Sequence, residues 1–198
     1  MNLTFAHRKA TQALNFFARK ETGRINKLKA LKLVFFADRC HLRRYGRPIT
    51  NDRYLAMNYG PVASSCKDLA EMSEFLGSEE RAYAEQYLAP DRHDYLSVGE
   101  IDEREFSQTD LEALEFAWDL YGAKDGFALA EETHLFPEWK QHEARLSSPY
   151  ESRVPMRYLD FLENPPEGVD PLPPLTSEEQ ADLREQIEEL HSVESLWR

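Results

Sequence analysis

Residues 25 to 62 constrain the fold most, because they hold one long helical pattern that runs into a short extended segment. Apolar residues recur at helical spacing through the first half of this stretch: Leu28, Leu31, Phe35 and Leu42, with Asp38 on the same line. Basic residues fill the positions between them: Lys27, Lys29, Lys32, Arg39 and Arg43. The pattern predicts a central helix with one buried face and one basic, solvated face.

The flanking residues indicate where this helix begins and ends. Asn26 is suited to cap its first turn, while Gly46 and then Pro48 predict that it stops near Tyr45. Residues 54–59 are typical of a strand. Because proline suits the first turn of a helix, the Gly60-Pro61 corner predicts a new helix that begins at Pro61.

The remaining pattern predicts a mainly α fold, a compact helical domain with a small antiparallel β element. A first helix is expected over residues 4–21 with Thr4 as its cap, and another from Ser107 to Gly122. Residues 93–98 alternate like a strand and are expected to pair with residues 54–59. Shorter helices are expected over residues 126–134 and from Pro137.

The C-terminal quarter has a different composition. We expect a domain over residues 1–145 and an extension over 146–198, in which residues 164–175 hold five prolines and predict a stiff linker. An acidic amphipathic helix over 176–196 should follow, with a narrow apolar stripe that must dock on something. Two docking sites for this helix are equally favoured: a groove on a partner, and the basic first half of the chain itself.

The net charge of −12 divides unevenly along the chain. Residues 1–70 carry a charge of +10, and residues 71–198 carry −22. We favour internal pairing of the two halves as the explanation. A basic face that is open to an acidic partner, including nucleic acid, is the alternative.

Two stretches carry a resemblance to a known family. The first is the helix, turn and corner just described, and the second covers residues 111–139, where Tyr121-Gly122 closes a helix before Thr133-His134. In this arrangement the chain resembles the SocA-like (Panacea) antitoxin domain over roughly residues 8–142. The residues that carry the family pattern and that we interpret as marks of the fold are Tyr45, Gly46, Pro48, Gly60, Pro61, Val62, His134 and Trp139.

Motifs for catalysis are missing from the sequence. It has no glycine-rich phosphate loop, G-x-S-x-G elbow, H-E-x-x-H or CxxC, so we expect neither an enzyme nor a cofactor. The histidines are scattered singly, which argues against a metal site. Cys40 and Cys66 are expected to be buried, unreactive thiols. Asp38 is expected to be a buried carboxylate that an Arg or Tyr partner satisfies.

The resemblance implies an antitoxin that neutralises a co-encoded toxin by direct contact. A DNA-binding autoregulator and an adaptor that delivers a partner to a protease are the alternatives. No long apolar run or signal peptide is evident, so we expect a cytoplasmic protein. The candidate partner-binding residues are Tyr59 at the corner and four apolar residues of the last helix: Leu183, Ile187, Leu190 and Trp197.

Overall fold

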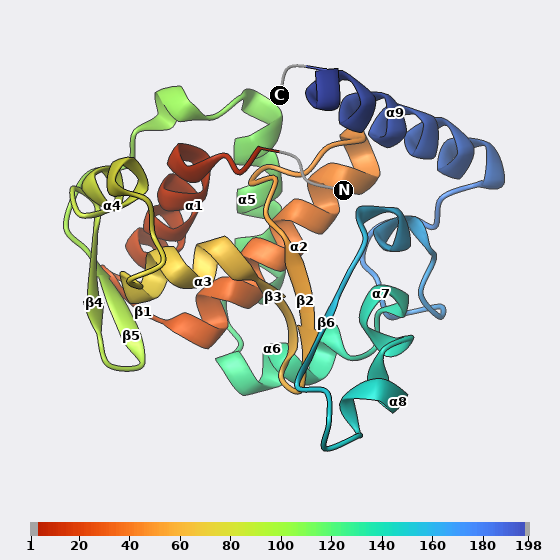
Figure 1. Cartoon of the computed structure of the whole chain (residues 1–198), viewed down its shortest axis with the longest axis horizontal. Coiled ribbons are helices and arrows are strands. Elements are labelled where there is room, and N and C mark those ends of the chain that lie inside the picture. The colour runs from red at the N-terminus through yellow and green to blue at the C-terminus, as the bar shows by residue number, and fades with distance from the viewer. Residues whose placement is uncertain (1–3, 197–198) are drawn as a thin grey trace.

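The computed structural model describes residues 4–196, and its fold is mainly α, as the sequence predicts (Figure 1). The α-helices are α1 (His7–Lys20), α2 (Lys27–Tyr45), α3 (Ser64–Glu71), α4 (Ser78–Ala84), α5 (Gln108–Tyr121), α6 (Gly126–Thr133), α7 (Pro137–Lys140), α8 (Glu143–Leu146) and α9 (Ser177–Leu196). Two 3-10 helices are η1 (Glu103–Glu105) and η2 (Tyr158–Leu162). The strands are β1 (Arg24–Asn26), β2 (Tyr54–Met57), β3 (Gly60–Ala63), β4 (Leu88–Asp91), β5 (Asp94–Ser97) and β6 (Arg153–Pro155).

The central helix α2 begins and ends as predicted. The Asn26 side chain accepts a hydrogen bond from the Lys29 amide, and Gly46 ends the helix in the left-handed conformation with φ of 69°. The helix crosses the middle of the molecule (Figure 1), and α1, α5, α6, β3 and η2 all pack on it.

The predicted solvated face of α2 is wrong. Lys29, Lys32, Arg39 and Arg43 are all buried, because elements from the whole chain cover the helix on every side. Burying a cation costs free energy unless other groups compensate it. The Arg39 guanidinium lies 2.6 Å from a Glu138 carboxylate oxygen, which compensates its positive charge.

The prediction that the two halves of the chain neutralise each other is confirmed. Of the fourteen basic residues before position 71, ten form ion pairs. Most of their partners come from the acidic later part: examples are Lys9 with Asp110 and Lys20 with Glu115. The basic charge that favoured nucleic acid is therefore largely satisfied within the molecule.

Six strands form two antiparallel sheets in the described part of the chain, with orders β1-β5-β4 and β3-β2-β6. The predicted pairing of residues 93–98 with 54–59 is wrong, since β5 lies between β1 and β4. Tyr95 explains why β5 pairs with β1 and not with β2. It lies opposite Ile25 in β1, its ring is buried, and its hydroxyl donates to the Leu14 carbonyl in α1.

The helix predicted to begin at Pro61 is also wrong. Residues 60–63 form β3, which turns back on β2 so that Pro61 lies opposite Ala56. Helix α3 begins only at Ser64, where the Asp52 carboxylate accepts hydrogen bonds from the amides of Ser65 and Cys66. Proline fits both a helix start and a strand, and here pairing with β2 decides between them.

Thr4 does not cap the first helix. Helix α1 begins at His7 after Ala6, with no side-chain cap, and the Ala6 amide donates to the Thr50 carbonyl. A backbone contact with a distant loop thus fixes the start of this helix, which a local pattern does not reveal.

The C-terminal segment lies against the rest of the chain. Strand β6 extends the β2 sheet, and Phe161 in η2 is buried in the main core. The Pro-rich residues 164–175 contribute Asp170, whose carboxylate lies 2.5 Å from the Arg39 guanidinium. Helix α9 runs along one edge of the molecule (Figure 1), with Leu183 and Ile187 buried against the domain. Of the two destinations left open for it, the structure shows its own domain.

Candidate functional site

The turn between β2 and β3 exposes an aromatic side chain. Tyr59 is 61% exposed, and Phe127 at the start of α6 is 66% exposed. Their ring centroids lie 6.0 Å apart with an interplanar angle of 75°, an edge-to-face contact. We call these two residues the aromatic tip. Exposed aromatic rings that touch each other are typical of the residues that dominate protein interfaces.

Buried donors hold the strand ends on both sides of Tyr59. The Lys32 ammonium in α2 donates to the Pro61 carbonyl at 2.6 Å, and the Trp139 indole in α7 donates to the Met57 carbonyl at 2.9 Å. Gly60 completes the turn with φ of +87°. The turn that presents Tyr59 is therefore fixed by the core beneath it.

Phe127 is fixed by the start of its own helix. The Asp125 side chain caps α6 by accepting hydrogen bonds from the amides of Phe127 and Ala128, each at 2.9 Å. Gly126 lies against the first turn of α2, where a Cβ would come within 3.0 Å of the Lys29 amide nitrogen. Phe127 is not among the residues predicted from the sequence, although an Asp-Gly cap before a phenylalanine was a usable signal.

His134 and Trp139 support the hairpin from inside. Their rings stack with centroids 3.8 Å apart and an interplanar angle of 18°. His134 also ends α6, and burial lowers the pKa of its imidazole, which favours the neutral ring. Trp139 also donates its indole hydrogen bond to the Met57 carbonyl, so the pair lies beside the end of β2.

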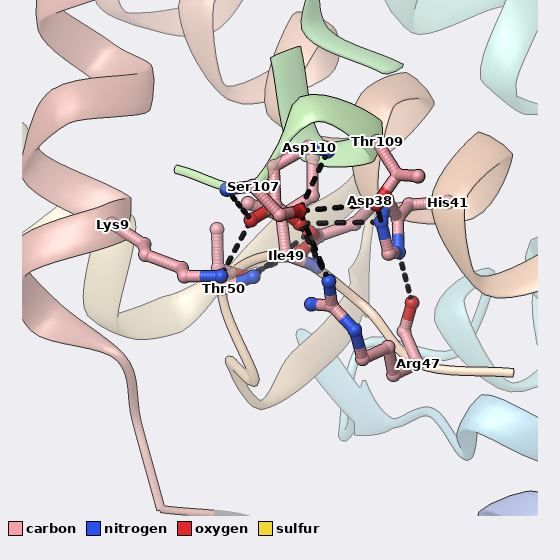
Figure 2. Close-up of polar contacts among 9 residues, drawn as sticks. All are labelled: Lys9, Asp38, His41, Arg47, Ile49, Thr50, Ser107, Thr109 and Asp110. Carbon is pink, nitrogen blue, oxygen red and sulfur yellow. Dashed lines mark hydrogen bonds and ion pairs between the residues drawn. The ribbon is translucent and has the colours of Figure 1, made fainter. Parts of the chain in front are cut away.

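A cluster of polar side chains around Asp38 and Asp110 holds the loop after α2 (Figure 2). The Asp38 carboxylate accepts hydrogen bonds from the Ile49 amide at 2.8 Å, the Thr50 amide at 3.0 Å, the Thr50 hydroxyl and the Tyr54 hydroxyl at 2.9 Å. Burial raises the pKa of Asp38 to about 6, and these four hydrogen bonds oppose that rise. Of the Arg or Tyr partner predicted for this carboxylate, the structure shows the tyrosine, Tyr54.

Asp110 joins three elements beside that loop. Its carboxylate lies 2.5 Å from the Lys9 ammonium and 3.2 Å from both His41 and Arg47, which converge on it in Figure 2. Burial opposes ionisation of Asp110, but Lys9 and Arg47 hold its pKa below the usual range. These contacts tie α1, α2 and the loop after α2 to the start of α5, so we assign the cluster to the fold.

The turn residues of the family pattern also lie at this end of α2. Tyr45 is partly exposed beside the His41 ring, and Pro48 is buried. Gly46 lies under α9, since a Cβ there would overlap the Gln186 side chain. Val62 in β3 is buried in the main core.

The candidate residues of α9 are divided. Leu183 and Ile187 face the chain's own domain, whereas Leu190 is 39% exposed. Trp197 lies outside the described residues. Helix α9, which carries Leu183, Ile187 and Leu190, lies far from α6 and from the turn between β2 and β3 (Figure 1).

Both cysteines are buried free thiols. Burial raises the pKa of Cys40 to about 11 and that of Cys66 well above its ordinary value, which keeps both thiols protonated. No group of three His, Cys, Asp or Glu side chains in these residues could hold a metal ion. Of the helices described, none is long and apolar enough to cross a membrane.

Substitution of Gly60 should disturb folding, because its φ is +87° and a Cβ would overlap the Thr133 hydroxyl and come within 2.9 Å of the Lys32 ammonium. We expect Gly60→Val to lower the free energy of unfolding by roughly 3 kcal/mol or more. Gly168→Val is the control, since Gly168 has φ of +82° with nothing within 4 Å of its Cβ. It should cost roughly 1 to 2 kcal/mol in urea denaturation. Equal losses would contradict a steric role for Gly60.

Lys32 should make stability depend on pH. Burial lowers the pKa of its ammonium to about 7, below the value of about 10.4 for an unfolded chain. Between those values the unfolded chain holds a proton that the folded chain lacks, so stability rises with pH. From pH 7 to 10, wild type should gain roughly 3 kcal/mol more than Lys32→Met.

The surface variant Lys140→Met is the control for this titration and should follow wild type, because Lys140 pairs with Glu143 in solvent. Denaturant titrations at both pH values measure the difference. A Lys32→Met curve parallel to wild type would show that the lysine is charged when buried.

Comparison with known proteins gives one family. Residues 31–140 match the family described as "Antitoxin SocA-like, Panacea domain". This span is more than half of the 198 residues and runs from the first turns of α2 to the end of α7. No curated protein and no solved structure gives a significant match. The chain belongs to the SocA-like antitoxin family and carries its Panacea domain.

Proposed function

We propose that this chain is a cytoplasmic antitoxin that neutralises a co-encoded toxin by binding it directly, without catalysis, and that the aromatic tip is the centre of the contact. The family match supports the antitoxin role. The exposed pair of Tyr59 and Phe127 supports the place of contact. The observation that carries the proposal is that this pair is exposed while hydrogen bonds hold the backbone on either side of it.

The tip has the properties that favour tight binding. Two aromatic rings offer a large apolar area, and few torsions must be fixed when a partner covers them. The hydrogen bonds from Lys32 and Trp139 already hold the Tyr59 turn in place. Little conformational entropy is then lost on binding, so more of the contact energy appears as affinity.

Helix α9 is the less favoured contact. Leu183 and Ile187 are covered by the chain's own domain, so a toxin would have to displace the helix before it reached them. Such a displacement would subtract the burial of two apolar side chains from the binding energy. Leu190 alone remains partly exposed on this helix among the candidate residues that the structure describes.

The double variant Tyr59→Ala/Phe127→Ala should lose the toxin. Truncation of a central interface aromatic costs about 2 kcal/mol or more, which is roughly thirtyfold in Kd for each residue. The control is Phe75→Ala/Tyr150→Ala, which removes the same ring types from two highly exposed positions elsewhere. Co-purification with the product of the neighbouring gene, and growth of cells that express it, measure the effect.

Both double variants should remain folded, because all four rings are largely exposed. Far-ultraviolet circular dichroism and thermal melting check this. If the tip variant still protects cells and co-purifies as well as wild type, the toxin contact lies elsewhere. If the control loses the toxin equally, the effect is not specific to the tip.

A further inference from the structure

A pocket of about 590 Å³ lies over β2, β6 and η2. Figure 1 shows β2 and β6 side by side there, and the register pairs Leu55 with Pro155. Partly exposed side chains of Leu55, Met156 and Tyr158 contribute apolar lining. The volume lies within the range of about 300 to 1,000 Å³ that is typical of small-molecule sites.

Three arginines line this pocket, and the strand geometry places them on one face. Val154 in β6 is buried while its neighbours are exposed, so Arg153 points outward. The Met156 amide donates to the Tyr54 carbonyl, which continues the β2–β6 ladder past its last pair. The same register brings exposed Arg53 opposite exposed Arg157. Like charges placed opposite each other on two strands are destabilising unless something neutralises them.

The side chains of two of these arginines form neither an ion pair nor a contact with an aromatic ring in the described part of the chain. Within residues 4–196, eleven arginines form ion pairs and Arg44 lies over the Phe116 ring. The arginines of this range that have neither kind of partner are Arg53, Arg92 and Arg153, and two of these three line the pocket. Arg157 pairs with Asp160. In a chain with a net charge of −12, two unpaired guanidinium groups at one pocket point to an anionic ligand.

Asp52 contributes a carboxylate to the pocket lining, but its oxygens accept hydrogen bonds from the backbone amides of Arg53, Ser65 and Cys66. Within the described residues, Asp52 forms no ion pair with an arginine side chain. The two unpaired positive charges match a phosphate group, which carries close to two negative charges at neutral pH, better than a single carboxylate.

We propose that this pocket binds a phosphorylated nucleoside, with its phosphates on Arg53 and Arg153 and its base against Tyr158 and Leu55. One guanidinium group can bind two oxygens of a phosphate at once, and a planar base packs well on aromatic and apolar side chains. The concave shape favours a small molecule over an extended polymer. The site is separate from the aromatic tip, so the inference does not depend on the toxin contact.

Isothermal titration of the full chain with ATP and GTP tests the proposal. At least one nucleotide should bind, and Arg53→Gln and Arg153→Gln should each weaken binding by about tenfold, the size expected for loss of a charge-assisted hydrogen bond. Arg92→Gln is the matched control, because it removes an exposed, unpaired arginine outside the pocket, and its Kd should stay within about twofold of wild type.

Titrations with the separate parts of the nucleotide test whether both its phosphates and its base contribute to affinity. Tripolyphosphate and adenosine should each bind more weakly than the nucleotide. The proposal is overturned if neither nucleotide binds, if tripolyphosphate binds as tightly as the nucleotide, or if the pocket variants bind like wild type. Tighter binding of a single-stranded oligonucleotide with the same arginine dependence would overturn it in favour of a nucleic-acid site. All three variants alter exposed side chains and should remain folded, which circular dichroism checks.

Discussion

The burial of charged residues on helix α2 is the constraint on which the rest of the structure depends. Arg39 lies in the core, where an unpaired guanidinium would cost several kcal/mol. Glu138 and Asp170 compensate it from positions 99 and 131 residues away. Arg43 reaches the carbonyls of Phe161 and Glu163 in the same way. The central helix is therefore stable in its place only when the C-terminal segments close over it.

This dependence explains which parts of the fold could be predicted from the sequence. Asn26 and Gly46 act on their own neighbours, so the limits of α2 followed from local rules. The burial of Arg39 did not, because its partners are far along the chain and a basic residue between apolar ones is usually exposed. The role of Pro61 was ambiguous for a similar reason, since only its pairing with Ala56 separates a strand from a helix start.

Because these charges pair within the molecule, the exposed aromatic rings are the clearest candidates for contact with a partner. Ten of the fourteen basic residues in the first part of the chain are ion-paired, and the polar groups around Asp38 and Asp110 are bound to the loop after α2. Against this background, the rings of Tyr59 and Phe127 remain uncovered. The sequence pointed to Tyr59 but not to Phe127, because their contact joins segments 68 residues apart. The fold thus supplies a rigid base, and we propose that its aromatic tip supplies the toxin contact.

Hydrogen–deuterium exchange of the chain, free and bound to the product of the neighbouring gene, tests that claim most directly. We expect slower exchange in the complex for residues 57–61 and 125–129, which carry the aromatic tip. Exchange in α9 should stay as it is in the free chain, because that helix keeps its own docking. Slower exchange confined to α9, or faster exchange there as the helix is displaced, with no change at the tip, would contradict the account.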